Sequence, residues 1–297
     1  MEAGLEARIE DEDWKNAAIS AGNLSELTLT LGQVARAVDH ARAAVELADR
    51  SEDLFQRMSK RTTLGDALHA AGGRDDAASA FRQAEVLQAE DQPQTPKLYS
   101  LQGYQYGDLL LSRAAPLDGS ALGWDVPVAG DEDARRRCEE VRERSEYALA
   151  IARAHGWLLD TALDHLSLGR GHLGLAPASG NDLDAAREPL ETAVQGLRAA
   201  GHEDDLPRGL LARATLHRFR HDVPAAERDL AEALEIAERG AMKLHACDAH
   251  LEWTRLCHAM GDHDDARAHL DAARALVEET GYHRRDDELA ALTAALS

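Results

Sequence analysis

Residues 64–87, LGDALHAAGGRDDAASAFRQAEVL, contain the pattern that decides the fold. Residues 256–277, LCHAMGDHDDARAHLDAARALV, repeat that pattern with the same offsets from a turn glycine. Gly72 is followed by alanine, phenylalanine and alanine 5, 9 and 12 positions later, and Gly261 is followed by alanine, leucine and alanine at the same distances. A frame that recurs in this way is typical of a protein built from stacked repeats.

The frame continues through most of the chain with a period of 40 residues. Its first alanine occurs at Ala37 and Ala77, and again at Ala186, Ala226 and Ala266. Small residues on one helix face let a second helix approach closely, and a glycine followed by aspartates ends one helix and begins the next. The pattern therefore predicts antiparallel helix pairs, each of which buries its apolar face against the next pair.

These stretches resemble the tetratricopeptide repeat family over about residues 12–296. The matching residues are Leu64, Gly65, Gly72, Ala77, Phe81 and Ala84. The resemblance implies an all-α, right-handed superhelical solenoid. The period departs from the family's repeat of about 34 residues, and Trp253 and Thr254 replace its Leu-Gly pair. Longer helices would absorb the additional residues.

We expect a single solenoid over residues 1–297, with about six repeats and a C-terminal helix. The predicted pairs are 12–50, 54–90, 97–155, 157–199, 205–239 and 243–279, with a last helix at 286–296. A loop insertion is expected at 114–132, where proline, glycine and aspartate accumulate. Residues 1–10 resemble the end of a preceding helix, which predicts an uncapped N-terminal end that could self-associate.

Composition narrows the classes of partner. The chain has 297 residues, 44% of them hydrophobic and only 4% aromatic, which favours a folded helical protein. Its formal net charge of −21 would repel nucleic acid and anionic membranes. No apolar run approaches the roughly 20 residues that span a bilayer, and the three cysteines form no CxxC motif. We expect a cytoplasmic protein with reduced thiols.

Two sequence patterns that could indicate a nucleotide site or a metal site are better explained as parts of helices. Gly169, Gly171 and Gly174 spell GxGxxG, but a helical pattern precedes them where a nucleotide site needs a strand. The histidines and cysteines of residues 245–258 include no pair at the i, i+4 spacing that places two ligands on one helix face. The sequence therefore predicts no enzyme activity, no cofactor and no metal site.

The binding surface is the functional prediction that the resemblance supports. In tetratricopeptide proteins the first helix of each pair lines a concave face that holds a protein or peptide. The residues placed there by the frame are Asn23, Glu26, Asp66, His69, Arg170, Arg208, Thr215, Arg255 and His258. The complete carboxylate clamp of chaperone adaptors is absent. Trp124, in the predicted loop, is a candidate partner anchor.

The leading hypothesis is a protein- or peptide-binding adaptor. Residues 156–170, GWLLDTALDHLSLGR, and 279–292, ETGYHRRDDELAAL, also resemble the C-terminal repeat region of bacterial STAND-type ATPases. That resemblance implies an alternative, a ligand-sensing region of a larger signalling protein. ATP hydrolysis is not implied, because the chain contains no GxxxxGK[ST] motif. Self-assembly through the N-terminal end is the third hypothesis.

Overall fold

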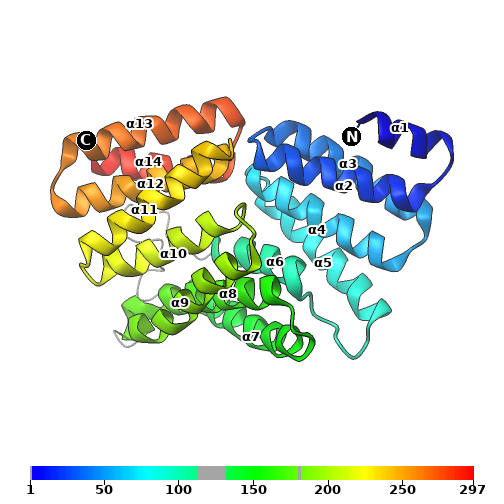
Figure 1. The fold of residues 1–297 in the computed structure, drawn as a ribbon, viewed down its shortest axis with the longest axis horizontal. Helices are drawn as coiled ribbons and strands as arrows, with labels where there is room; N and C mark the ends of the chain where they lie inside the picture. Colours follow the sequence, from blue (N-terminus) through cyan, green and yellow to red (C-terminus); the bar gives the residue numbers. More distant parts are fainter. Residues whose placement is uncertain (1, 113–131, 180–181) are drawn as a thin grey trace. The chain divides into compact units, whose positions relative to one another are not determined.

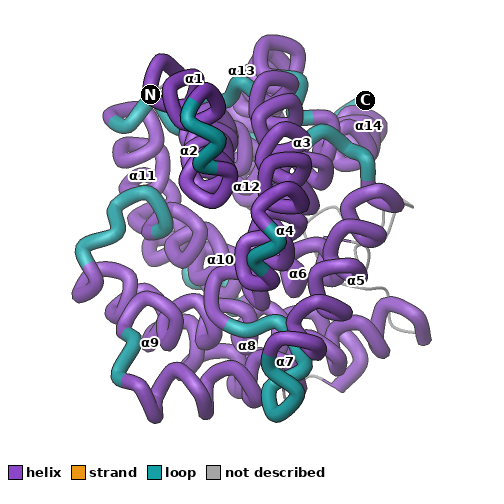
Figure 2. Tube along the Cα trace, turned by 90° about the vertical axis from the view of Figure 1, so that its right-hand side faces the viewer, coloured by secondary structure: helices purple, strands orange, loops and turns teal. Residues whose placement is uncertain are grey.

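The computed structural model describes residues 2–112, 132–179 and 182–297. These residues form helices joined by turns and loops, with no β-strand among them (Figures 1 and 2). The helices are α1 (Glu2–Glu10), α2 (Trp14–Thr30), α3 (Val34–Ser51), α4 (Leu54–Ala70), α5 (Arg74–Asp91), α6 (Ser100–Ser112), α7 (Glu132–His155), α8 (Leu158–Ser179), α9 (Asp182–Ala200), α10 (Leu206–Phe219), α11 (Val223–Arg239), α12 (Lys243–Met260), α13 (His263–Thr280), the 3-10 helix η1 (His283–Arg285) and α14 (Asp286–Ala295). The prediction of an all-α helical repeat is confirmed.

The chain divides into two compact units. Unit 1 comprises Met1–Leu98 and Thr280–Arg284, and unit 2 comprises Tyr99–Glu279 and Arg285–Ser297. In unit 1 the pairs α2–α3 and α4–α5 pack against each other through α3 and α4, and α1 packs on α2. In unit 2 the same neighbour-to-neighbour packing runs through α6, α7, α8, α9, α10, α11 and α12. One continuous solenoid over residues 1–297 stays a prediction.

The turns between paired helices repeat one hydrogen-bond pattern. Gly72 has a φ of +83°, and the amide of Gly73 donates to the carbonyl of Leu68 at 2.9 Å. Gly261, with a φ of +81°, occupies the same place after α12, where the amide of Asp262 donates to Cys257 at 2.9 Å. Glycine adopts this left-handed conformation at little cost. The chain can therefore reverse while the turn amides donate to the last carbonyls of the first helix.

The alanine frame lies at the helix contacts. Ala37, Ala77, Ala186, Ala226 and Ala266 are all 0% exposed. A side chain this small lets the backbones of neighbouring helices approach closely while leaving no void.

Two glycines in first helices bring the helices of a pair still closer. A Cβ atom at Gly65 would lie 2.7 Å from the Phe81 ring, and one at Gly169 would lie 2.6 Å from the Leu190 side chain. Both large partners are 0% exposed. Gly169, Gly171 and Gly174 all lie inside α8, so the strand-to-helix loop that a dinucleotide site requires is not formed there.

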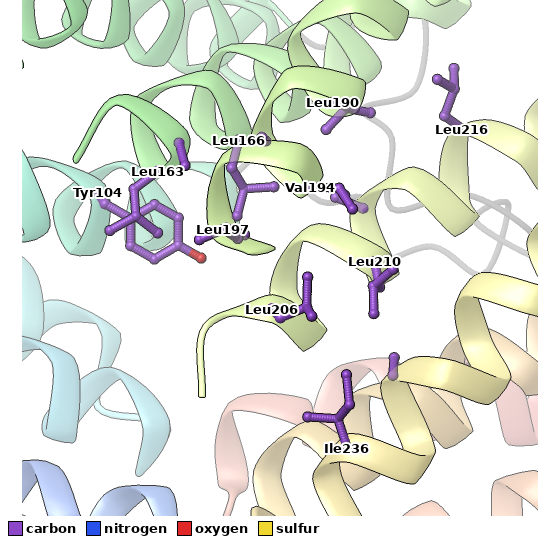
Figure 3. Packing of buried hydrophobic residues seen from close by; sticks show 14 of the residues in the cluster. Tyr104, Leu163, Leu166, Leu190, Val194, Leu197, Leu206, Leu210, Leu216 and Ile236 are labelled. Atoms are coloured by element: carbon purple, nitrogen blue, oxygen red, sulfur yellow. The ribbon is translucent and has the colours of Figure 1, made fainter. Parts of the chain in front are cut away.

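The larger unit buries a continuous leucine-rich core. Figure 3 shows Leu163 and Leu166 of α8 beside Leu197 of α9, with the Tyr104 ring of α6 next to Leu163. Leu210 of α10 extends the same cluster toward α11. These side chains interlock helices from successive pairs, so each pair completes the core of its neighbour.

We predict that Gly65→Ala destabilises the protein by about 1–3 kcal/mol, because the added methyl group would overlap the fully buried Phe81 ring. The matched control is Gly4→Ala in α1, where an added Cβ meets nothing within 4 Å. That change should stabilise the helix by up to about 1 kcal/mol. Urea unfolding followed by circular dichroism measures both. Equal stability of Gly65→Ala and the wild type would contradict the packing argument.

Candidate functional site

The first helices of unit 1, α2 and α4, present an exposed surface with a buried cation beside it. Asn23 and Glu26 of α2 are exposed, and Leu27 next to them is 44% exposed. Lys60 of α4 is only 6% exposed and lies against Gly22, where an added Cβ would be 2.8 Å from the lysine Nζ atom. The missing side chain at Gly22 therefore makes the room that the ammonium group occupies.

The ammonium group of Lys60 is unusually poor in partners. Within the described part of the chain it makes no hydrogen bond and no ion pair at 4.0 Å or less. Its pKa is lowered because burial disfavours the charged form, an effect that the negative charge of Glu26 only partly opposes. The Thr63 hydroxyl donates to Glu26 at 3.5 Å and so holds that carboxylate near the lysine. A desolvated cation of this kind would gain from an acceptor supplied by another molecule.

The other two predicted residues of unit 1 are less accessible. Asp66 of α4 is half-buried, and His69, one turn further along the same helix, is 0% exposed. The structure thus places Asn23 and Glu26 on the open surface and encloses His69. Lys60, which the sequence did not single out, shares its place in the 40-residue frame with Ser20. That shared position does not mark it, because the room for its ammonium group comes from Gly22 on another helix.

In unit 2 the predicted residues on α8 and α10 are engaged by their own neighbours. Arg170 forms a 2.7 Å ion pair with Asp108 of α6. Arg208 lies 3.6 Å from Asp205, and its guanidinium group also lies over the Tyr104 ring at 5.3 Å. The Arg170 pair joins α8 to α6, Arg208 pairs with Asp205 at the start of its own helix, and its contact with Tyr104 joins α10 to α6. The charges that were predicted to meet a partner thus have structural contacts within unit 2.

A buried ion network occupies the first helices at the C-terminal end of unit 2. Glu252 of α12 accepts from Arg218 of α10 at 2.6 Å and from Arg255 at 3.1 Å. Arg255 also pairs with Glu288 of α14, which in turn contacts Arg285 at 2.9 Å. Arg285 pairs with Asp248 at 2.8 Å. Arg218, Glu252 and Arg255 are buried and the other three groups are half-buried, and the pairing of opposite charges offsets part of the cost of removing them from water.

Of the remaining predicted residues, Arg255 belongs to this network and Thr215 and His258 have other contacts. Arg255 is 4% exposed, and Thr215 is 9% exposed and donates to the Leu211 carbonyl at 3.0 Å. His258 is half-buried, with its ring 5.3 Å from that of His263. Trp124 lies outside the described residues. The accessible part of the predicted surface is therefore concentrated in unit 1.

The three cysteines are free and buried. Burial raises the pKa of Cys138 to about 12 and that of Cys257 to about 11, and it raises the pKa of Cys247 as well. Because the thiolate is the reactive form, these side chains are poor nucleophiles and poor metal ligands at neutral pH.

Comparison with protein-family models gave no match, and no curated protein matched the chain either. Among solved structures, the chain is similar to the crystal structure of BtubC (BKLC) from P. vanneervenii. The two share 17% sequence identity with a TM-score of 0.45, over 84% of this chain and 90% of that one. A likeness this distant carries no argument about function. In the described residues, none of the helices combines the length and the apolar character needed to cross a bilayer.

Asp164 of α8 is a buried acid that makes a pH-dependent contribution to stability. It is 2% exposed, and its Oδ2 atom has no hydrogen-bond partner within the described chain. Burial, aided by the negative charge of Asp160 one turn earlier, raises its pKa to about 8. The carboxyl group therefore carries its proton at neutral pH in the folded protein and loses it in the unfolded one.

We predict that Asp164→Asn stabilises the protein at pH 7 by several kcal/mol. The folded protein holds a proton that the unfolded chain releases, so wild-type stability should fall by about 1.4 kcal/mol per pH unit between about pH 4 and the folded pKa of about 8. The variant should lack that slope. Urea unfolding from pH 5 to pH 8 measures it, with Asp39→Asn, at an exposed carboxylate of α3, as the control. Parallel stability curves for Asp164→Asn and the wild type would rule out this role.

Proposed function

We propose that the chain is a tetratricopeptide-type repeat protein of the cytoplasm that binds a protein or peptide partner, and that α2 and α4 of unit 1 form the contact surface. This surface is defined by Asn23, Glu26, Leu27 and Lys60. The observation that carries the proposal is the Lys60 side chain, which is only 6% exposed and whose ammonium group lacks an ion-pair partner within the described chain, while exposed polar residues adjoin it. No catalytic role is proposed for any residue.

The chemistry of the surface suits an extended polypeptide. Asn23 offers both a donor and acceptors to a peptide backbone, and Leu27 supplies exposed apolar area beside it. Phe55 lies on α4, the other helix of this surface. It is 49% exposed and adds an aromatic side chain. A carbonyl or carboxylate oxygen of the partner that reaches Lys60 would restore the interactions that the ammonium group lost on burial.

Long-range charge favours a partner of the opposite sign. The net charge of −21 attracts basic polypeptides and speeds their association, whereas Lys60 selects locally for an acceptor group. The partner that fits both conditions is a basic segment that contains a carboxylate or an exposed main-chain carbonyl. Its encounter rate with the protein should fall as salt is added.

The test is selection from a random peptide library, followed by affinity measurement on the enriched peptides by fluorescence anisotropy. We expect Lys60→Met to weaken their binding about 10-fold or more, because an acceptor desolvated at this point would lose its charged donor. The same variant should fold at least as stably as the wild type, since methionine buries no unpaired charge.

The matched control is Lys243→Met in unit 2, which removes an exposed lysine that pairs with Glu279 at 2.6 Å. It should leave peptide affinity within about twofold, since exposed ion pairs contribute little. Failure to enrich any peptide sequence, or equal loss of affinity in both variants, would contradict the proposed surface.

A further inference from the structure

A tryptophan stands where a capping residue is expected at the start of α8, in unit 2. The Trp157 carbonyl accepts from the amide of Thr161 at 3.0 Å, which is the first hydrogen bond of the helix, so Trp157 is its N-cap residue. At the same position before α2 and α4, Asp13 and Asp53 cap their helices with a carboxylate. An indole ring has a donor but no acceptor, so α8 goes without this stabilising bond.

The Trp157 side chain is not a core residue either. It is 38% exposed, and Leu158 beside it is 63% exposed. Met242, which begins α12 without a side-chain cap, is by contrast 5% exposed and packs in the hydrophobic core. Trp157 therefore serves neither of the structural purposes that explain the residues at these other helix starts. A large aromatic side chain left on the surface in this way is the kind that anchors a partner.

Two further rings of unit 2 hold the indole in place. The His155 ring stacks on it with a centroid distance of 4.5 Å and an interplanar angle of 20°. The Tyr99 ring, just before α6, is parallel to the indole within 7° at a centroid distance of 6.4 Å. The Nδ1–H group of His155 donates to the Ile151 carbonyl at 2.9 Å and so fixes that ring. Rings that are already ordered lose little conformational entropy when a partner binds.

The polar groups beside these rings are engaged within the chain, except for one donor. The Ser100 hydroxyl donates to Asp160, and the Thr161 hydroxyl donates to the Trp157 carbonyl at 2.7 Å. The indole N–H of Trp157 makes no hydrogen bond to any described residue. The surface thus offers apolar area with an open donor. It suits a ligand that is largely apolar and carries an accessible carbonyl oxygen, whereas a ligand rich in donors would find few acceptors.

We propose that Tyr99, His155, Trp157 and Leu158 form a second contact surface, which binds a proline-rich segment in the polyproline II conformation. Proline has no N–H, so such a segment presents apolar rings and carbonyl oxygens without partners in their own helix. The rings pack on aromatic side chains, and a carbonyl accepts from the indole N–H. Basic residues beside the prolines favour association with a protein of net charge −21.

The test uses two labelled synthetic peptides with the full chain. The probe has about ten prolines between pairs of arginines, and the reference peptide has the same arginines around a glycine-serine spacer of equal length. Fluorescence anisotropy should show the polyproline probe binding about 10-fold more tightly or better. In NMR spectra of the ¹⁵N-labelled protein, the indole N–H signal of Trp157, identified by its loss in Trp157→Phe, should shift when the probe binds.

Trp157→Asp should weaken binding of the polyproline probe about 10-fold or more, even though it adds a charge that attracts arginine. Aspartate restores a capping carboxylate, so this variant should fold, which circular dichroism checks. Trp157→Phe keeps a ring but removes the donor, and it should weaken binding about 3-fold to 5-fold. The control is Val86→Ser in unit 1, where a side chain that is 68% exposed is replaced. It should leave the affinity within about twofold.

Lys60→Met separates this surface from the one proposed on α2 and α4, because it should leave the affinity for the polyproline probe within about twofold. Equal binding of the two peptides would mean attraction by charge alone and would overturn the inference. The absence of binding by the polyproline probe, or equal affinities of Trp157→Asp and the wild type, would overturn it as well. Loss of binding in Lys60→Met but not in Trp157→Asp would assign the peptide to the α2 and α4 surface instead.

Discussion

Close approach of two helices at residues that lack side-chain bulk is the constraint on which the rest of the structure depends. Ala77 and Ala84 of α5 are fully buried, and Gly65 of α4 leaves only enough room for the Phe81 ring. The same relation joins Gly169 of α8 to Leu190 of α9. Because backbones this close fix how each pair packs, the frame also fixes which residues of the first helices face outward.

The two units use their first helices in different ways. In unit 2 the charges pair with one another across neighbouring helices, and Arg218, Glu252 and Arg255 are 2%, 3% and 4% exposed. Buried ion pairs of this kind cost desolvation, and removing one partner would leave the other uncompensated. In unit 1 Lys60 has no such partner within the described chain. A bound partner that supplies an acceptor could therefore offset the free-energy cost of burying this side chain.

The sequence predicted the features of the structure that depend on a local residue pattern. The glycine and alanine frame predicted helix pairs, and α4 and α12 end at Ala70 and Met260, just before the turn glycines Gly72 and Gly261. Asn23 and Glu26, which the frame placed on a binding surface, lie exposed on α2, and their role in binding stays a prediction. Periodicity conveys these features because each depends on neighbours within one helix or one turn.

Features that depend on contacts between helices could not be predicted in this way. The burial of Lys60 depends on the space at Gly22 of another helix, and the enclosure of Arg255 depends on Glu252 and Glu288. The contact between His250 and His269 depends on how α12 packs on α13, because 19 residues separate the two histidines in the sequence. The division into two units likewise has no local signature, since the repeat frame appears in both.

We propose that unit 1 meets a protein partner through α2 and α4. The most direct measurement places a photo-crosslinking amino acid at Asn23 in the source cells, and in parallel at Arg42, whose side chain is 61% exposed on the second helix α3. Mass spectrometry then identifies the crosslinked peptides. We predict a discrete partner at position 23 that is absent at position 42 and is lost when Lys60→Met is combined with the crosslinker. Identical products from both positions, or none from position 23, would contradict the account.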